Sequence, residues 1–303
     1  MRLKLLPLLL LCLLLPLPIH AQNEDEDDPP ATTFDAANST PAQSTDHAWS
    51  MLTDALNDTK HSPTRTQALA ALSILGSNPR STEMIVKAMN DPDYEVRTAA
   101  ILAAEQTKDH DLASSVRDKL ADEEPQVAFT AAVVLARMGD RTGADILSAV
   151  VDGERKATPG TVNSTLHTMN KDLHNPASIA KVGALQGAAM FLGPFGIGVA
   201  AYSYLRKNGS DSTRVTAIEE LNRVHSSDIH GTLIDALDDK DPGVRAAAAK
   251  ALAEYPDSPK ASPLLPLFTD SKEPVRLTAA AAYLRSTGTA PVAAKPAGTK
   301  KKK

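Results

Sequence analysis

The sequence predicts an all-α fold, an α-solenoid in which antiparallel helix pairs stack into a superhelix. One observation is a motif of Asp, Pro, Val and Arg that recurs about every 31 residues. Another is the composition, in which alanine is abundant and aromatic residues make up 4%. Such a composition suits closely packed helices, because alanine favours the helix and lets helix axes approach. Finally, no run of alternating β-branched residues predicts a strand.

The first 21 residues have the pattern of a secretory signal peptide. Arg2 and Lys4 supply positive charge, a nearly unbroken leucine run extends from Leu5 to Leu17, and Ala21 offers a small residue for cleavage. The apolar run is too short to cross ~30 Å of hydrocarbon as a mature helix. We therefore expect export to the periplasm or the extracellular space, with a mature chain that begins at Gln22. The alternative is an uncleaved N-terminal anchor.

Cysteine content and charge exclude several kinds of site. The only cysteine, Cys12, lies in the signal peptide, so the mature chain would have no disulfide, thiolate ligand or cysteine nucleophile. The net charge is −5, and loss of Arg2 and Lys4 makes it −7. Such a chain is a poor partner for nucleic acid.

Two polar tails flank the predicted solenoid. Residues 22–45 form an acidic linker that starts with the run Glu24 to Asp28, and residues 288–303 end in the lysine run Lys300 to Lys303. Neither tail has enough apolar content to offset the entropy of ordering it, so we predict disorder for both. The favoured interpretation of the lysine run is a solvated tail that keeps the chain soluble. The alternative is weak contact with an anionic membrane surface.

The repeats are predicted over residues 46–142 and 211–287. Val96 and Val127 are 31 residues apart, as are Val244 and Val275. A fixed period near 31 with helical patterning is typical of stacked helix pairs. In each repeat an Asp- and Pro-rich turn joins the two helices, where Asp caps free N–H groups and Pro fits the first helical turn. The valine then begins the buried stripe of the second helix.

An aspartate lies six residues before the arginine position of the motif in four repeats. This spacing bridges the turn, so each aspartate can meet the arginine of its own or of the next repeat in a ladder along the stack. Ala128 replaces the arginine in the third repeat. Because the architecture uses these positions repeatedly, we interpret them as structural. The motif residues are Asp91, Arg97, Asp122, Val127, Asp239, Arg245, Asp270 and Arg276.

The pattern Asp…Pro-x-Val-Arg-x-x-Ala-Ala resembles the HEAT-repeat family, particularly the short bacterial HEAT-like repeats also found in phycobilin lyases. The resemblance covers about 200 of the 303 residues. It implies armadillo-like superhelical stacking, with neighbouring helix pairs packed in sequence order, and partner binding on a curved face. It does not imply one activity.

Residues 143–210 interrupt the repeats with a degenerate repeat and an apolar insertion. Ala128 and Arg214 are 86 residues apart, about 24 more than two repeats fill, and residues 182–205 carry no charge. Three interpretations remain open: a buried helix pair broken at Gly193-Pro194, a membrane-associated segment, or a partly exposed groove that binds a partner. In the third, the partner-binding residues are Phe191, Phe195, Tyr202 and Tyr204.

Motifs of known chemistry are missing from the sequence. No histidine is followed by glutamate, and the histidine pairs 167/174 and 225/230 have no third ligand type beside them. No nucleophile elbow, phosphate-binding loop or dinucleotide fingerprint follows a predicted strand. We therefore predict no catalytic residue, no cofactor and no metal.

These observations together predict an exported, non-enzymatic scaffold or adaptor that binds a protein partner through its solenoid surface. One alternative is the HEAT-like body of an enzyme-associated protein, as the resemblance to lyases and hydroxylases would imply; bound pigment or iron would favour it. Another is a membrane-peripheral protein attached through residues 182–205.

Overall fold

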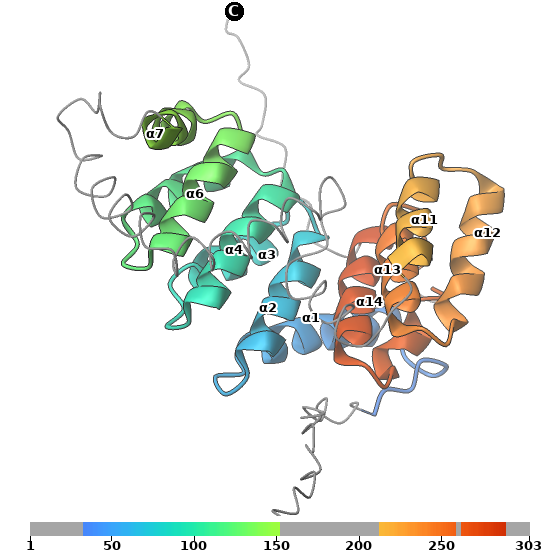
Figure 1. The fold of residues 1–303 in the computed structure, drawn as a ribbon. Coiled ribbons are helices and arrows are strands. Elements are labelled where there is room, and N and C mark those ends of the chain that lie inside the picture. Colours follow the sequence, from blue (N-terminus) through green and yellow to red (C-terminus); the bar gives the residue numbers. More distant parts are fainter. Residues whose placement is uncertain (1–32, 152–211, 259–261, 289–303) are drawn as a thin grey trace, which may run out of the picture.

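The computed structural model describes residues 33–151, 212–258 and 262–288. Every regular element in these ranges is a helix, and the helices pack as an α-solenoid (Figure 1). The N-terminal block, residues 33–151, contains α1 (Pro41–Leu56), α2 (Ser62–Ser73), α3 (Pro79–Ala88), α4 (Tyr94–Thr107), η1 (His110–Leu112), α5 (Ala113–Asp118), η2 (Lys119–Ala121), α6 (Pro125–Arg137) and α7 (Arg141–Val151). The C-terminal block, residues 212–288, contains α11 (Ser212–Asn222), α12 (Ser227–Asp235), η4 (Ala236–Asp238), α13 (Pro242–Leu252), η5 (Leu265–Thr269) and α14 (Glu273–Ser286).

The second helix of each pair is here called a B helix. Among α2, α4, α6, α13 and α14, α4 and α13 start with the predicted aspartate cap, and all but α4 have proline in the first turn. Asp93 and Asp241 accept hydrogen bonds from main-chain N–H groups in the first turns of α4 and α13, each at 2.8 Å. Pro125 and Pro242 occupy the first turns of α6 and α13, where the missing N–H costs nothing. The B helices are α2, α4, α6, α11, α13 and α14.

Helix α1 begins at Pro41, inside the stretch expected to be a linker up to residue 45. Thr40 and Gln43 form a capping box: the Gln43 N–H donates to Thr40 Oγ1 (3.3 Å) and the Thr40 N–H donates to Gln43 Oε1 (2.8 Å). This exchange satisfies two N–H groups that a helix start leaves free. The linker boundary predicted at residues 45/46 therefore lies too late in the sequence.

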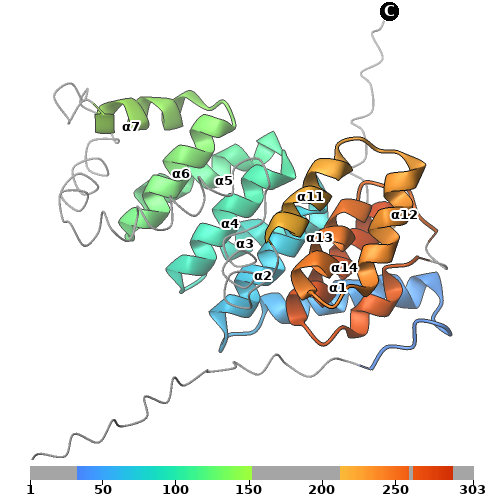
Figure 2. The same ribbon diagram turned by 45° about the vertical axis from the view of Figure 1, so that its right-hand side comes forward.

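The order of the B helices in space differs from their order in sequence. Within the N-terminal block α2 packs on α4 and α4 on α6, and within the C-terminal block α11 packs on α13 and α13 on α14. Helix α14, however, packs against α1 and α2 (Figure 2). The stack therefore runs α11, α13, α14, α2, α4, α6, α7. The expectation of packing in sequence order is confirmed within each block, but the sequence did not predict the contact of α14 with α1 and α2.

The contact between α14 and the pair α1/α2, here called the junction, covers surfaces that would otherwise be bare. The first repeat of an open stack exposes one apolar side. Here α14 covers it, and the four alanines 279–282 of α14 are completely buried among α1, α2, α13 and η5. Covering this side removes apolar area from water. A regular repeat spacing carries no information about this contact between the two blocks, because it specifies only which helices are neighbours in sequence.

An aromatic cluster fills the junction. The Phe34 ring stacks on His47 of α1 with centroids 4.6 Å apart and lies 5.3 Å from Phe268 of η5. Phe268 meets Tyr283 of α14 edge to face at 5.6 Å, a favoured aromatic geometry. Phe268 and Tyr283 are fully buried. Part of the N-terminal segment is thus held between α1 and the C-terminal block.

Polar contacts also cross the junction. Thr64 Oγ1 of α2 donates to Glu273 Oε2 of α14 at 2.9 Å, and both residues are buried. Arg285 Nη1 donates to the main-chain oxygen of Ile74 at 2.6 Å. Each contact joins residues more than 200 positions apart. They fix the register of α14 along α2.

Two glycines test how tightly the helices pack. A Cβ on Gly143 of α7 would lie 2.4 Å from Ala136 N and 2.5 Å from Ala132 O, both backbone atoms of α6. We expect Gly143→Ala to destabilise the protein by about 1–3 kcal/mol through overpacking, despite the better helix propensity of alanine. Urea unfolding measures this change. A Gly143→Ala protein as stable as the wild type would contradict the close approach of α7 to α6.

The matched control is Gly231, a helical glycine of α12 with no atom within 4 Å of a Cβ built on it. Gly231→Ala should stabilise the protein by roughly 0.5–1 kcal/mol, because only the backbone entropy and helix propensity change.

Candidate functional site

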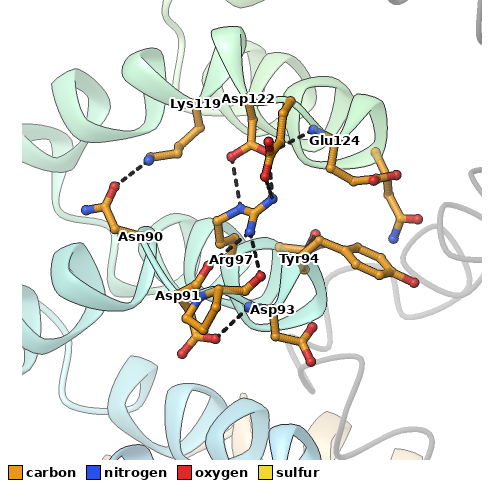
Figure 3. Close-up of polar contacts among 12 residues, drawn as sticks. Asn90, Asp91, Asp93, Tyr94, Arg97, Lys119, Asp122 and Glu124 are labelled. Atoms are coloured by element: carbon orange, nitrogen blue, oxygen red, sulfur yellow. Dashed lines mark hydrogen bonds and ion pairs between the residues drawn. The ribbon is translucent and has the colours of Figure 1, made fainter. Parts of the chain in front are cut away.

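A ladder of arginine–aspartate pairs links consecutive repeats. Arg97 donates from Nε and Nη2 to the two carboxylate oxygens of Asp122 at 3.0 and 2.8 Å (Figure 3). The same two-pronged contact joins Arg65 to Asp91 (3.0 and 3.0 Å) and Arg245 to Asp270 (2.7 and 2.8 Å). Arg214 meets Asp239 likewise. A planar guanidinium that bonds both oxygens sets distance and angle together.

Four of the arginines, Arg65, Arg97, Arg245 and Arg276, also donate to main-chain oxygens at the start of their own repeat. Arg97 Nη1 donates to the main-chain oxygen of Asp91 at 2.9 Å, and Arg276 Nη1 donates to that of Asp270 at 2.8 Å. The sequence left open whether aspartate meets the arginine of its own or of the next repeat. In the structure the main-chain oxygen of the aspartate accepts from the arginine of its own repeat. Its carboxylate accepts from the arginine of the repeat before it. One side chain thus fixes both the turn and the stacking.

The carboxylates of the ladder also order the turns. Asp91 Oδ1 accepts from the N–H of Asp93 (2.9 Å), and Asp122 Oδ1 accepts from the N–H of Glu124 (3.0 Å). Asp239 and Asp270 accept in the same way from residues two positions on. Such local bonds stabilise a turn. They hold each carboxylate where it accepts from the arginine of the preceding repeat.

The ladder is buried where it joins the repeats of the N-terminal block. The side chains of Arg97 and Asp122 are 9% and 7% exposed, and Val127, which follows in α6, is fully buried. The ladder weakens toward α11, where the Arg214 side chain is 46% exposed. It has no arginine at Ala128, which is buried; beyond it, Arg117 pairs with Asp140 at the surface.

Asp239 gives the ladder a pH dependence. The hydrogen bond from Arg214 lowers the pKa of Asp239 to about 2 from its ordinary value of 3.8. Because the folded pKa is depressed, this pair stabilises the fold above pH 3.8, and the contribution is lost as the pH falls through about 2. We expect the free energy of unfolding of Asp239→Asn to depend less steeply on pH than that of the wild type between pH 3.8 and about 2.

The matched control for that titration is Asp238→Asn, at an exposed neighbour. Urea unfolding between pH 5 and pH 2 measures the free energy of unfolding of the wild type, Asp239→Asn and Asp238→Asn. If this free energy falls as steeply with pH in Asp239→Asn as in the wild type, the pair of Arg214 and Asp239 does not contribute to the pH dependence.

The B helices share a second feature, an outward side that we call the B-helix face. Five residues after the ladder position stand Ala70 of α2, Leu102 of α4 and Val133 of α6, all partly exposed. At the corresponding position of α13 stands Lys250, whose Nζ lies 3.7 Å from Glu219 Oε1 of α11. At the same position of α14 stands Ala281, which is fully buried. The face is therefore apolar over the N-terminal block and charged at α11 and α13.

Burial perturbs the charged end of this face. It raises the pKa of Glu219 and lowers the pKa of Lys250, and their mutual attraction opposes both shifts. Further along the helices, Ser73 donates to Gln106 (3.0 Å) and Arg137 pairs with Glu105 (3.3 Å). These links hold neighbouring B helices in register, so the face is rigid.

The aromatic residues predicted to bind a partner, Phe191, Phe195, Tyr202 and Tyr204, lie outside the described residues, as do His167 and His174. His225 and His230 both stack on the Tyr255 ring, with ring centroids 5.1 and 4.8 Å from it. The described residues contain no group of three or more His, Cys, Asp or Glu that could hold a metal ion. Over the same residues, no helix is long and apolar enough to span a bilayer.

The fold and the ladder together define an α-solenoid repeat protein. A family model described as HEAT repeats matches residues 82–158 and 200–285, more than half of the chain. The chain belongs to the HEAT-repeat family. A comparison with curated proteins finds no match.

Proposed function

We propose that the protein is an exported, non-enzymatic scaffold that binds a protein partner along the B-helix face. HEAT repeats are helical scaffolds suited to protein interaction. The observation that carries the proposal is the row Ala70, Leu102 and Val133, three apolar side chains left partly exposed on adjacent, tightly held helices.

A rigid apolar strip with charges at one end has the composition of a protein interface. Such interfaces combine an apolar centre with a polar rim, and side chains on helices lose little entropy when a partner binds. The charged end at Glu219 and Lys250 would fix the direction of the bound segment.

A substitution at the centre of the row tests the proposal. We expect Leu102→Asp to lower partner capture from the native envelope fraction at least tenfold, because a carboxylate would have to be desolvated in the interface. The matched control is Ser114→Asp on α5, which is exposed and lies outside the B helices. Equal recovery of every co-purifying protein with both variants would refute binding along this face.

Export rests on the pattern of residues 1–21 and has a separate test. N-terminal sequencing of the protein from cells should start at Gln22, and fractionation should place it outside the cytoplasmic membrane. A chain that retains Met1 in the cytosol would overturn export without affecting the binding proposal.

A further inference from the structure

We propose that His47 makes the junction sensitive to mild acid: with a neutral imidazole it holds residues 33–40 against the C-terminal block, and with a protonated one it releases them. These residues, here called the strap, lead directly into α1, which begins at Pro41. This conformational device lies within the fold and is independent of what the B-helix face binds.

Three aromatic rings from three parts of the chain meet at the strap. Phe34 of the strap lies parallel to His47 of α1, with ring centroids 4.6 Å apart and an angle of 7° between the planes. Phe34 also lies 5.3 Å from Phe268 of η5, and His47 lies 6.0 Å from the same ring. Of these three rings, only that of His47 can take up a proton.

The ring contacts attach the strap to the C-terminal block, whereas the hydrogen bonds of the strap are local. Asp35 accepts from the N–H of Asn38 at 3.2 Å, and Ser39 Oγ lies 2.9 Å from Ser44 Oγ at the start of α1. Neither of these bonds reaches the C-terminal block. Loss of the contacts of Phe34 would therefore release the strap while its own turn and the start of α1 stay folded.

A proton on His47 opposes this stacking, because the surroundings of the ring are apolar. Burial lowers the pKa of His47 below its ordinary value of 6.5, and Asp54 on the same helix raises it by a smaller amount. An imidazolium needs water or acceptors at both N–H groups, and Phe34 and Phe268 offer neither. The attraction between a cation and the face of Phe34 is weak and leaves the direction of the shift unchanged.

The other ionisable groups around His47 are engaged elsewhere or keep their charge state near neutral pH. Burial raises the pKa of Tyr283 of α14, so this group stays neutral. Asp46, beside His47 in α1, is exposed, and η5 contains no ionisable residue. The charged side chains of the strap, α2 and α14 have partners of their own: Asp35 with Asn38, Arg65 with Asp91, Glu273 with Thr64, Arg276 with the main-chain oxygen of Asp270, and Arg285 with that of Ile74.

The closed strap is favoured at neutral pH and loses this preference in mild acid. Since the closed state lowers the pKa of His47, the released state binds the proton more tightly. The contribution of the stack is complete above pH 6.5 and is lost as the pH falls below that value toward the lower pKa of the closed state. Acidification thus shifts the population toward a released strap without a ligand.

Hydrogen exchange of the full chain measures the opening of the strap. Protection of the amides of residues 34–48, corrected for the intrinsic exchange rate at each pH, should be about threefold lower at pH 5.5 than at pH 7.5. Amides of α6, which packs on α4 and α7, should keep their protection. Equal protection of the strap at the two pH values would overturn the proposal.

His47→Phe separates the charge from the ring, because Phe34 can still stack on a phenylalanine that takes up no proton. This variant should keep the protection of the wild type at pH 7.5 and lose the threefold change. Where the larger ring does not fit, His47→Gln, which also lacks the charge, should likewise show no change. Either variant with the full change of the wild type would refute the role of His47.

The matched control is His61→Gln. His61 pairs with Asp58 at the start of α2, and its side chain is 52% exposed, so its loss should leave the pH dependence of the strap as in the wild type. The imidazole signal of His47, identified by nuclear magnetic resonance through its absence from His47→Gln, should titrate with a midpoint below 6.5. A midpoint at or above that value, or a pH dependence that disappears in His61→Gln, would contradict the proposal.

Discussion

Arg97→Ala is expected to destabilise the protein by about 3–5 kcal/mol, the cost of leaving one partner of a buried ion pair alone. Asp122 would lose both guanidinium bonds while its side chain stays almost completely buried. The turn before α4 would also lose donors, because Arg97 Nη1 bonds the main-chain oxygens of Asp91 and Pro92. Urea unfolding followed by circular dichroism measures the change.

The control for Arg97→Ala is Arg117→Ala. Arg117 also pairs with an aspartate, Asp140, but its side chain is 45% exposed, and exposed pairs contribute about 0–1 kcal/mol. A loss of equal size in the two variants would mean that burial does not determine the strength of the ladder. Arg97→Lys should lie between them, since lysine keeps the charge but loses the two-pronged geometry.

Tyr283→Ala is expected to cost about 3–5 kcal/mol, as for other buried aromatic residues cut back to alanine. The effect should be local, because Tyr283 belongs to the junction. Removing the ring takes away the edge-to-face contact with Phe268 and the hydrogen bonds with Thr45 and Ser44, which oppose the rise that burial gives to the pKa of Tyr283. Hydrogen exchange should accelerate in α1 and α14 and much less in α6.

Tyr94→Ala is the matched control for Tyr283→Ala, since Tyr94 is 36% exposed at the start of α4. Its loss should change the free energy of unfolding by no more than about 0.5 kcal/mol, as for other surface substitutions. Unchanged exchange in α1 of the Tyr283→Ala protein would show that the junction does not hold the blocks together.

The sequence predicts the helix pairs and the ladder residues because both repeat. A period of 31 residues places Arg97 and Arg245 at equivalent positions, and the six-residue spacing places Asp91 and Asp239 across the turn from them. Hydrophobic periodicity then defines the buried stripe that starts at residues such as Val127. These features depend only on neighbours in sequence.

The junction could not be predicted in this way, because a repeat period describes neighbours in sequence, and Thr64 and Glu273 meet across 209 positions. One usable signal was the scarcity of aromatic residues: Phe34, Phe268 and Tyr283 stand out in a chain with five Phe and five Tyr. The start of α1 was missed for a related reason. Thr40 and Gln43 form a capping box inside a polar stretch, where composition indicated a linker.

The junction brings the first and last helices of the described chain together in the middle of the stack. In most solenoids the first and last repeats are the outermost layers, and trimming them leaves the interior whole. Here α1 and α14, the outermost helices by residue number, touch each other at mid-length of the assembly. Shortening the polypeptide from either terminus beyond its tail would therefore cut the described stack through its centre. The two ends of that stack, α7 and α11, can be removed only by excision from within the chain.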